Sequence, residues 1–171
     1  ILYPTAVIGP GDYNDSLFGQ AIQKMATGRL PALVSGGFDW VDARDVAWAA
    51  IEAAERGDDR DRFLLSGHYH DMRYVADVIA SYSGVAAPRF SCPIWLARVF
   101  APFMGQWASL RNEEPLYTQG SLTALSSNTD MSHALAGDRL GYSPRPFDES
   151  IKDALEFYSQ RGKAKLGSNG N

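Results

Sequence analysis

Cysteine is nearly absent from this sequence of 171 residues: Cys92 is the only one, so the chain cannot form an internal disulfide. Such scarcity is typical of proteins in a reducing compartment, and we expect a cytoplasmic protein. No stretch reaches the roughly 18 uninterrupted apolar residues that a membrane-spanning helix needs. The N-terminus also lacks the charged start of a signal peptide. We therefore expect no membrane partner.

The sequence also lacks a strong charge of either sign. Its formal net charge is -4, and no long run of like charges occurs, so nucleic acid is not an expected partner. The apolar content of 45% is enough to fill the core of one domain of average size. We expect a globular protein with a small-molecule substrate, and the choice between a monomer and a homo-oligomer stays open.

Several patterns that would signal stand-alone chemistry are missing. The sequence has no closely spaced glycine loop for a phosphate and no Gly-x-Ser-x-Gly nucleophile motif. Cys92 carries no signal of activation. His68, His70 and Asp71 resemble part of a zinc site, but no further His or Cys ligand accompanies them, so we interpret them as polar residues of a loop. We assign no metal site and no catalytic residue.

The opening stretch has the pattern of a buried strand that leads the chain to a ligand. Ile1, Leu2, Val7 and Ile8 are typical of a buried strand, and glycine and proline at residues 9–11 then turn the chain out of the sheet. In α/β proteins, ligands bind just past such strand ends. Because the sequence begins inside this predicted strand, we interpret it as a fragment or a processed product.

Helical periodicity alternates with short apolar runs along the rest of the chain. It predicts helices at residues 16–27, 42–56, 71–83, 116–125, 132–140 and 148–158, and strands at 62–66 and 89–92. Asp42 and Asp148 are the expected N-caps of two of these helices, and Asp45 is expected to complete a capping box. The alternation is typical of an α/β fold with a parallel sheet. So few strands need further strands from elsewhere in the polypeptide or from a second chain.

Three motifs in order carry a resemblance to a known family. They are YPTAVIGPGD at residues 3–12, FDWVDARDVA at 38–47 and LGYSPRP at 140–146. Together they resemble the C-terminal half of extended short-chain dehydrogenase/reductases, above all the NAD(P)-dependent epimerase/dehydratase group that includes dihydroflavonol reductases. The resemblance implies the C-terminal part of a Rossmann-type parallel sheet with a mostly helical substrate-binding subdomain.

That resemblance also implies boundaries, a cofactor and site residues. Residues 1–92 would complete the NAD(P)-binding domain, 93–162 would form the substrate-binding subdomain, and 163–171 would be a disordered tail. NAD(P)(H) would be bound mainly by an upstream half. The family's segment beside the nicotinamide corresponds to Pro4, Thr5, Ala6 and Val7, and the residues bordering the substrate would be Asn14, Ser16, Leu17, Phe38 and Trp40. Tyr3 departs from the family, which usually has asparagine there.

The family's catalytic Tyr-x-x-x-Lys pair is missing: none of the eight tyrosines is followed by lysine four residues later. The tyrosine of that pair protonates the carbonyl oxygen while hydride arrives from the nicotinamide. We therefore expect this chain alone to be inactive. Asp42 and Asp45 are interpreted as helix caps, and Arg145 either faces the substrate or fixes the connection before the last helix.

The leading hypothesis is the substrate-binding portion of an NAD(P)-dependent oxidoreductase that acts on a ketone, an aldehyde or the corresponding alcohol. The aromatic run from Trp95 to Trp107 favours a hydrophobic substrate. A nucleotide-sugar epimerase or dehydratase of the same family is the first alternative. A non-catalytic binding or regulatory protein is the second, and a fragment that folds only by self-association is the third.

Overall fold

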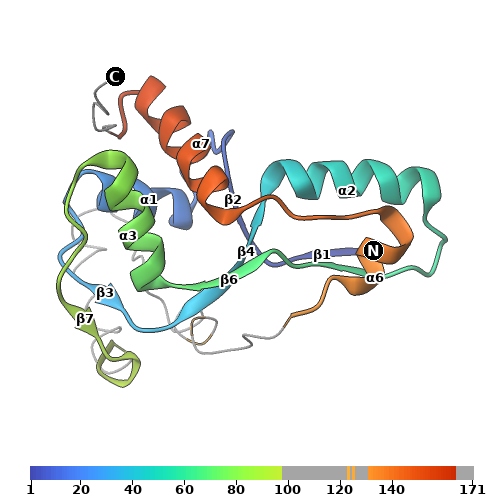
Figure 1. Ribbon diagram of the computed structural model, residues 1–171, viewed down its shortest axis with the longest axis horizontal. Coiled ribbons are helices and arrows are strands. Elements are labelled where there is room, and N and C mark those ends of the chain that lie inside the picture. The colour runs from blue at the N-terminus through green and yellow to red at the C-terminus, as the bar shows by residue number, and fades with distance from the viewer. Residues whose placement is uncertain (98–122, 124, 126–130, 165–171) are drawn as a thin grey trace.

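The computed structural model describes residues 1–97, 123, 125 and 131–164. The predicted helix at 116–125 and most of the aromatic run therefore lie outside the described residues. Within these ranges, no helix combines the length and the apolar character that a membrane crossing requires. Figure 1 shows α2 running along β1, with α1, α3 and α7 grouped at the other end of the strands.

The strands form three small sheets, and the predicted parallel pairing is confirmed. The strands are β1 (Leu2–Pro4), β2 (Ala6–Ile8), β3 (Leu33–Val34), β4 (Gly37–Asp42), β5 (Phe63–Leu65), β6 (His68–Asp71) and β7 (Ser91–Cys92). β1 pairs with β5, β2 with β4 and β3 with β7, all in parallel, whereas β6 adds to β4 antiparallel. The prediction of a loop at residues 68–71 is thus wrong, because these residues pair with β4 and form a strand.

Five described helices agree closely with the predicted ones. They are α1 (Leu17–Ala26), α2 (Ala43–Arg56), α3 (Met72–Ser83), α6 (Ala134–Leu140) and α7 (Phe147–Gln160). Ser16, Asp42 and Asp71 cap α1, α2 and α3 through their side chains, because each accepts a hydrogen bond from an otherwise unpaired backbone N–H. Gly84 and Gly141 end α3 and α6 in the left-handed conformation that glycine adopts without strain.

Two predicted caps are wrong. α7 begins one residue before Asp148, and the carboxylate of Asp148 instead accepts a hydrogen bond from the hydroxyl of Tyr74 at 3.1 Å. Asp45 lies in the first turn of α2 but accepts from Arg145, at 2.9 Å from the backbone N–H and at 2.8 Å from the guanidinium. A charged partner from a distant segment thus displaces the local capping box, and it also settles Arg145 as the residue that fixes the last connection.

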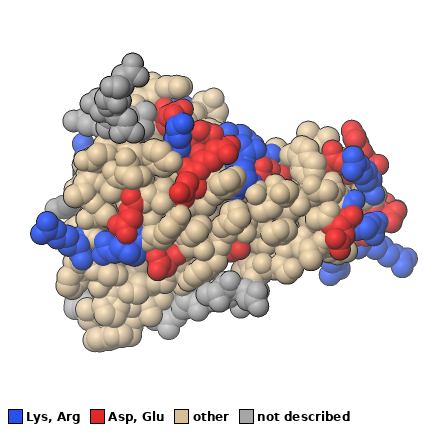
Figure 2. Space-filling model, in the orientation of Figure 1, with Lys and Arg blue, Asp and Glu red and all other residues tan. Residues whose placement is uncertain are grey.

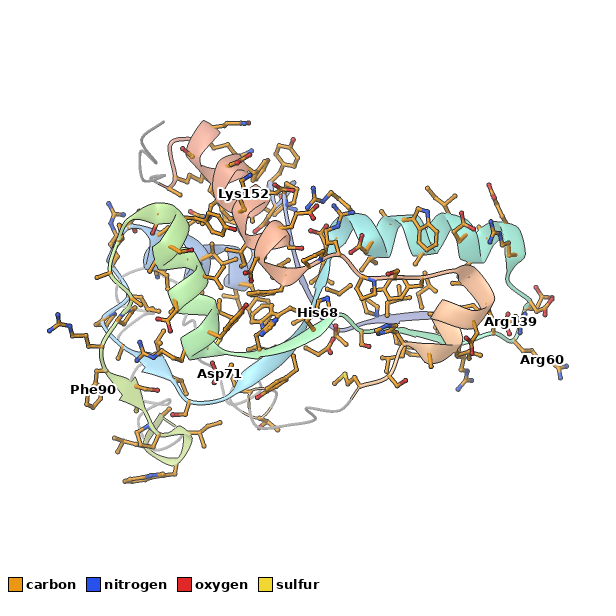
Figure 3. The ribbon with its side chains drawn as sticks, in the orientation of Figure 1. Arg60, His68, Asp71, Phe90, Arg139 and Lys152 are labelled. Carbon is orange, nitrogen blue, oxygen red and sulfur yellow. The ribbon has the colours of Figure 1, made fainter. Side chains whose placement is uncertain are left out.

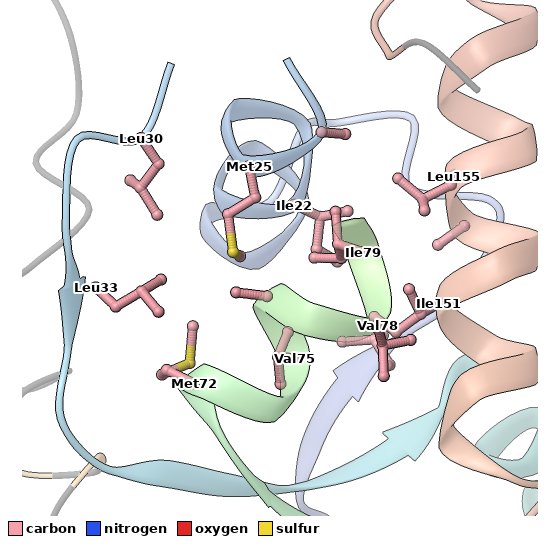
Figure 4. Close-up of a cluster of buried hydrophobic side chains, with 14 of the residues drawn as sticks. Ile22, Met25, Leu30, Leu33, Met72, Val75, Val78, Ile79, Ile151 and Leu155 are labelled. Atoms are coloured by element: carbon pink, nitrogen blue, oxygen red, sulfur yellow. The ribbon is translucent and has the colours of Figure 1, made fainter. Parts of the chain in front are cut away.

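Two hydrophobic cores lie on opposite faces of β4. The larger joins α1, α3 and α7, and Figure 4 shows its members Ile22, Met25, Val75, Ile79 and Leu155 pointing toward one another. The smaller joins α2, α6 and β5 around the buried residues Val41, Ala49, Phe63, Leu65 and Leu140. Side chains of β4 alternate between the two cores, as a strand buried on both faces requires.

The opening strand differs from the prediction of a continuous buried strand. It divides at Thr5 into β1 and β2, which join different sheets. Tyr3 and Val7 are 45% and 37% exposed, while Ile8 is buried. Each short strand thus packs on one face only, and the described residues leave the other face open to solvent. At the opposite end of the chain, the predicted tail begins with Lys163, which pairs with Asp15, and with Ala164, which is buried.

Asp42 joins β4, α2 and α7 through one buried carboxylate. Its side chain caps α2 and also accepts hydrogen bonds from the guanidinium of Arg44 at 2.9 and 2.8 Å. Arg44 continues to Asp153 of α7 at 2.6 Å. Figure 2 shows the acidic and basic side chains gathered where α7 meets the start of α2. Burial opposes the ionisation of Asp42, but hydrogen bonds from Arg44 and Ser150 outweigh it and lower the pKa of the carboxyl group.

We expect Asp42→Asn to lower the free energy of unfolding by about 2 kcal/mol at pH 7, because it removes the buried one of the two carboxylates that pair with Arg44. Asparagine still caps the helix, so the loss reports the ion pair. Since the folded-state pKa lies below the unfolded value of about 4, the stabilisation is present above that pH and is lost as the pH falls through the folded pKa. Urea denaturation between pH 7 and pH 3 measures both effects.

Glu149→Gln provides the control for this measurement. Glu149 also pairs with an arginine, Arg145, but at 3.5 Å and with a half-exposed side chain. Its replacement should change the free energy of unfolding by less than about 0.5 kcal/mol. An equal loss in the two variants would mean that Asp42 contributes no more than a surface charge.

Candidate functional site

The candidate site is a fork in the strands at the carboxyl ends of β1 and β5. These two strands are parallel neighbours, and just past them the chain passes at Thr5 into β2 and at Ser66 and Gly67 into β6. Unlike β1 and β5, the strands β2 and β6 do not pair with each other, because β4 lies between them. Figure 1 shows the strands diverging at this point. Ligands of open α/β sheets bind beyond the carboxyl ends of parallel strands, so the fork lies where a ligand site is expected.

Asp39 of β4 lies inside the fork and connects its two branches. Its Oδ1 accepts from the Thr5 hydroxyl at 2.7 Å and from the Gly67 backbone N–H at 2.8 Å. The Thr5 backbone N–H donates to the Leu65 carbonyl at 3.2 Å. The side chain of Asp39 is only 6% exposed. The two branches are therefore held at a fixed separation by one oxygen atom.

A second polar group closes the fork from the side of α6. Ser66 is fully buried, and its hydroxyl lies 3.0 Å from His133 Nδ1 and 3.2 Å from the Met131 carbonyl. Tyr142 donates its hydroxyl hydrogen to the Ser66 carbonyl at 3.1 Å, and burial raises the pKa of this tyrosine. The hydroxyl and the carbonyl of Ser66 are thus both paired inside the protein.

The structure places the four predicted cofactor-side residues across the fork. Pro4 and Val7 are exposed, whereas Thr5 and Ala6 are half-buried. The segment thus presents an apolar surface at the carboxyl end of β1. Figure 3 shows His68, the first residue of β6, beside the same junction.

The five predicted substrate-side residues fall into two groups. Asn14, Ser16 and Leu17 are exposed; the first two lie in the loop after β2, and Leu17 begins α1. Phe38 and Trp40 belong to β4, and the register places Trp40 beside Ala6. Trp40 itself is only 4% exposed, and its indole N–H donates to the His70 carbonyl at 3.2 Å. Trp40 therefore supports the site from within the core.

One aromatic ring that sequence reasoning missed connects these two groups. Phe18 follows Leu17 at the start of α1, and its ring lies 5.0 Å from the rings of both Phe38 and Trp40 in edge-on contact. Phe38 and Trp40 are 5.3 Å apart. The three rings form an aromatic cluster that joins the start of α1 to β4. The signal available in the sequence was the position of Phe18 beside a predicted site residue.

The loop after β2 is held to the C-terminal helix. Asp12 accepts hydrogen bonds from the Ser16 backbone and hydroxyl and from Tyr158 of α7, the last at 2.8 Å. Asp15 pairs with Lys163, which lowers the pKa of its carboxyl group. The predicted substrate-side loop is therefore anchored at two points, to Tyr158 of α7 and to Lys163 just past the end of that helix, 146 and 148 positions later in the chain.

His68 and His70 share a face of β6, but His68 is exposed and the ring of His70 lies among aromatic rings. The His70 ring stacks on Tyr74 at 4.2 Å and contacts Phe147 at 4.6 Å. Burial and the neighbouring His68 lower the pKa of His70, so its neutral form is favoured. The described residues contain no group of three or more His, Cys, Asp or Glu side chains that could hold a metal ion.

Comparisons with known proteins agree with this architecture. The chain is 28% identical over 166 residues to the sterol demethylase protein B of Methylococcus capsulatus, which covers 95% of this chain and 50% of that protein. It is 26% identical to a putative dihydroflavonol 4-reductase of Synechocystis, covering 96% and 49%. No family model matches the chain.

Solved structures share the fold. The crystal structure of gox2253 is 28% identical, superimposes with a TM-score of 0.77, and covers 96% of this chain and 50% of that chain. The UDP-glucuronic acid 4-epimerase of Bacillus cereus, solved with UDP-glucuronic acid and NAD, is 14% identical with a TM-score of 0.66 and covers 94% and 45%.

The fold and the fork define part of a Rossmann-type α/β protein, as predicted. The homologues are extended short-chain dehydrogenase/reductases, which confirms the resemblance seen in the three motifs. This chain spans about half the length of the curated relatives that it matches.

We expect Gly67→Ala to destabilise the fork, because a Cβ at residue 67 would lie 1.9 Å from the Trp40 carbonyl oxygen. Backbone must shift to relieve that contact, at a cost of about 2 kcal/mol or more. Gly137→Ala is the matched control. Its Cβ would lie no closer than 3.5 Å to the Tyr142 carbonyl, inside α6, where alanine is favoured by up to about 1 kcal/mol. Thermal unfolding of both variants tests the close approach of β4 to Gly67, and equal melting temperatures would contradict it.

Proposed function

We propose that this chain is the substrate-binding portion of an NAD(P)-dependent oxidoreductase that reduces a ketone or aldehyde, or oxidises the alcohol. The observation that carries the proposal is the fork, which holds the cofactor-side segment at the carboxyl end of a parallel strand pair. The relationship to an NAD-dependent family supports the cofactor. A small molecule is the expected partner, and cytoplasmic placement and oligomeric state stay predictions from the sequence.

The residues at the fork fit a nicotinamide ring. Pro4 and Val7 offer exposed apolar surface, and Ala6 between them has too small a side chain to block access. When bound, the cofactor would supply or accept a hydride. The role of this chain is to hold one face of the ring against the segment from Pro4 to Val7 and to keep water away from it. Proton transfer would come from the family's Tyr-x-x-x-Lys pair, which these 171 residues do not contain.

A hydrophobic substrate is favoured by the aromatic cluster of Phe18, Phe38 and Trp40. None of the predicted substrate-side residues is charged, and a diphosphate would favour Arg or Lys there. The names of the two curated relatives refer to a sterol and a dihydroflavonol, which are ring compounds without a diphosphate group. Asn14 and Ser16 would provide the polar contacts that orient such a substrate, and Leu17 would add apolar area.

Two alternatives have their own support. Nucleotide-sugar epimerases share the fold at low sequence identity, which favours the epimerase reading. The absence of the catalytic pair favours a non-catalytic binding protein on the same scaffold. Both would keep the fork, and the substrates that the fusion described below turns over separate them from the reductase.

Binding of the nicotinamide end can be measured on the chain itself. We expect millimolar nicotinamide mononucleotide to shift the backbone amide resonances of Thr5, Ala6 and Val7 in nuclear magnetic resonance spectra. Adenosine monophosphate serves as the control, because the adenine-binding residues of the family lie upstream of this segment. Shifts with the adenine nucleotide alone, or shifts confined to other residues, would contradict the proposal.

The substrate class can be tested in a fusion to the half of the Synechocystis relative that this chain does not match. We expect oxidation of NADH or NADPH with apolar aromatic ketones and no turnover of UDP-sugars. Phe38→Ala should lower kcat/KM for the ketone by about tenfold or more, because it removes one face of the aromatic cluster. Phe90→Ala, which changes an exposed ring elsewhere, is the control. Turnover of UDP-sugars alone would favour the epimerase.

A further inference from the structure

Strands that separate at a fork leave backbone and side-chain groups without ladder partners. β1 and β5 pair through Pro4 and Leu65, and the next residues of both branches leave that ladder. Buried N–H groups need a partner, because an unpaired one costs a large part of a hydrogen bond. The Gly67 N–H and the Thr5 hydroxyl are the two donors at this place, and both find the same acceptor.

That acceptor, Asp39, differs from the other buried carboxylates of β4 and α2. Asp42 and Asp45 each pair with an arginine, whereas Asp39 forms no ion pair with any described residue. Two neutral donors converge on its Oδ1 atom instead. Asp39 is only 6% exposed. A carboxylate buried in this way, with two convergent bonds and no ion pair, fixes the positions of its donors more than it balances a charge.

The position of Asp39 ties it to the predicted nicotinamide-side segment. It precedes Trp40, which the register places beside Ala6, and its bond to Thr5 falls in the middle of the segment from Pro4 to Val7. The bond to Gly67 fixes the other branch, where the close approach to the Trp40 carbonyl leaves no room for a side chain. Movement of Asp39 would therefore change the spacing of both branches.

We propose that Asp39 is a positioning residue for the cofactor: through Thr5 and Gly67 it sets the backbone of the segment from Pro4 to Val7 against which the nicotinamide lies. The inference rests on the proposed function and goes beyond it, because Asp39 acts through two other residues without touching the ring. Since a single oxygen accepts both bonds, an amide carbonyl can replace the carboxylate. Asparagine should therefore substitute for Asp39, and alanine should not.

The test compares four variants of the chain in matched pairs. Asp39→Ala and Thr5→Val remove the acceptor or the hydroxyl, while Asp39→Asn and Thr5→Ser keep an oxygen in each place. We expect affinity for nicotinamide mononucleotide to fall about tenfold or more in the first two variants and to stay within about threefold of the original chain in the other two. Amide hydrogen exchange at Gly67 should speed up about tenfold or more in Asp39→Ala only, because that bond is lost.

Asp138→Asn, an exposed carboxylate on α6, controls for the loss of a negative charge and should change neither measurement. If the original chain does not bind the mononucleotide, the proposed function and the positioning role fail together. If it binds and Asp39→Ala binds equally well, only the positioning role fails. Unchanged exchange at Gly67 in Asp39→Ala would overturn the role of Asp39 independently of any ligand. Equal losses in the alanine and asparagine variants would assign the effect to charge and also overturn it.

Discussion

The described structure depends on the buried carboxylate of Asp42. One side chain caps α2, holds Arg44 and, through it, ties α7 to the strands. It also lies against Gly9, where a Cβ would come within 3.2 Å of both carboxylate oxygens, so the turn after β2 starts at the same point. The sites for cofactor and substrate lie on either side of this turn in the proposed arrangement. This one charge links β4, α2, α7 and the turn after β2. Such a link explains why a small set of short strands keeps a defined geometry.

Asp39 and Asp42 show how one strand assigns two roles to the same residue type. Both lie on β4, but they point to opposite faces because they are three residues apart. Asp42 faces the larger core and α7, where arginines meet it. Asp39 faces the smaller core, where only neutral donors reach it. The first carboxylate fixes helices to the sheet, and the second fixes two strand branches to each other.

Much of the fold could be predicted from local signals, since Ser16, Asp42, Asp71, Gly84 and Gly141 mark helix ends by chemistry that acts within a few residues. What escaped prediction depends on distant partners. Asp45 joins Arg145, 100 positions away, and β6 exists because β4 pairs with it. The candidate site followed the same division. The resemblance suggested the segment from Pro4 to Val7, whereas Asp39 and Gly67 became visible only when strand register brought them to Thr5.

The polar groups of the fork are paired with one another, which bears on how the proposed site could work. Thr5 is paired with Leu65 and Asp39, Gly67 with Asp39, and Ser66 with groups from residues 131–142. A surface that is already ordered loses little conformational entropy when a ring settles on it, and that saving appears as affinity. In the proposed arrangement, the catalytic pair and this surface are therefore separable in physical terms: one would supply protons, and the other would supply a fixed place for the ring, held by bonds internal to these residues.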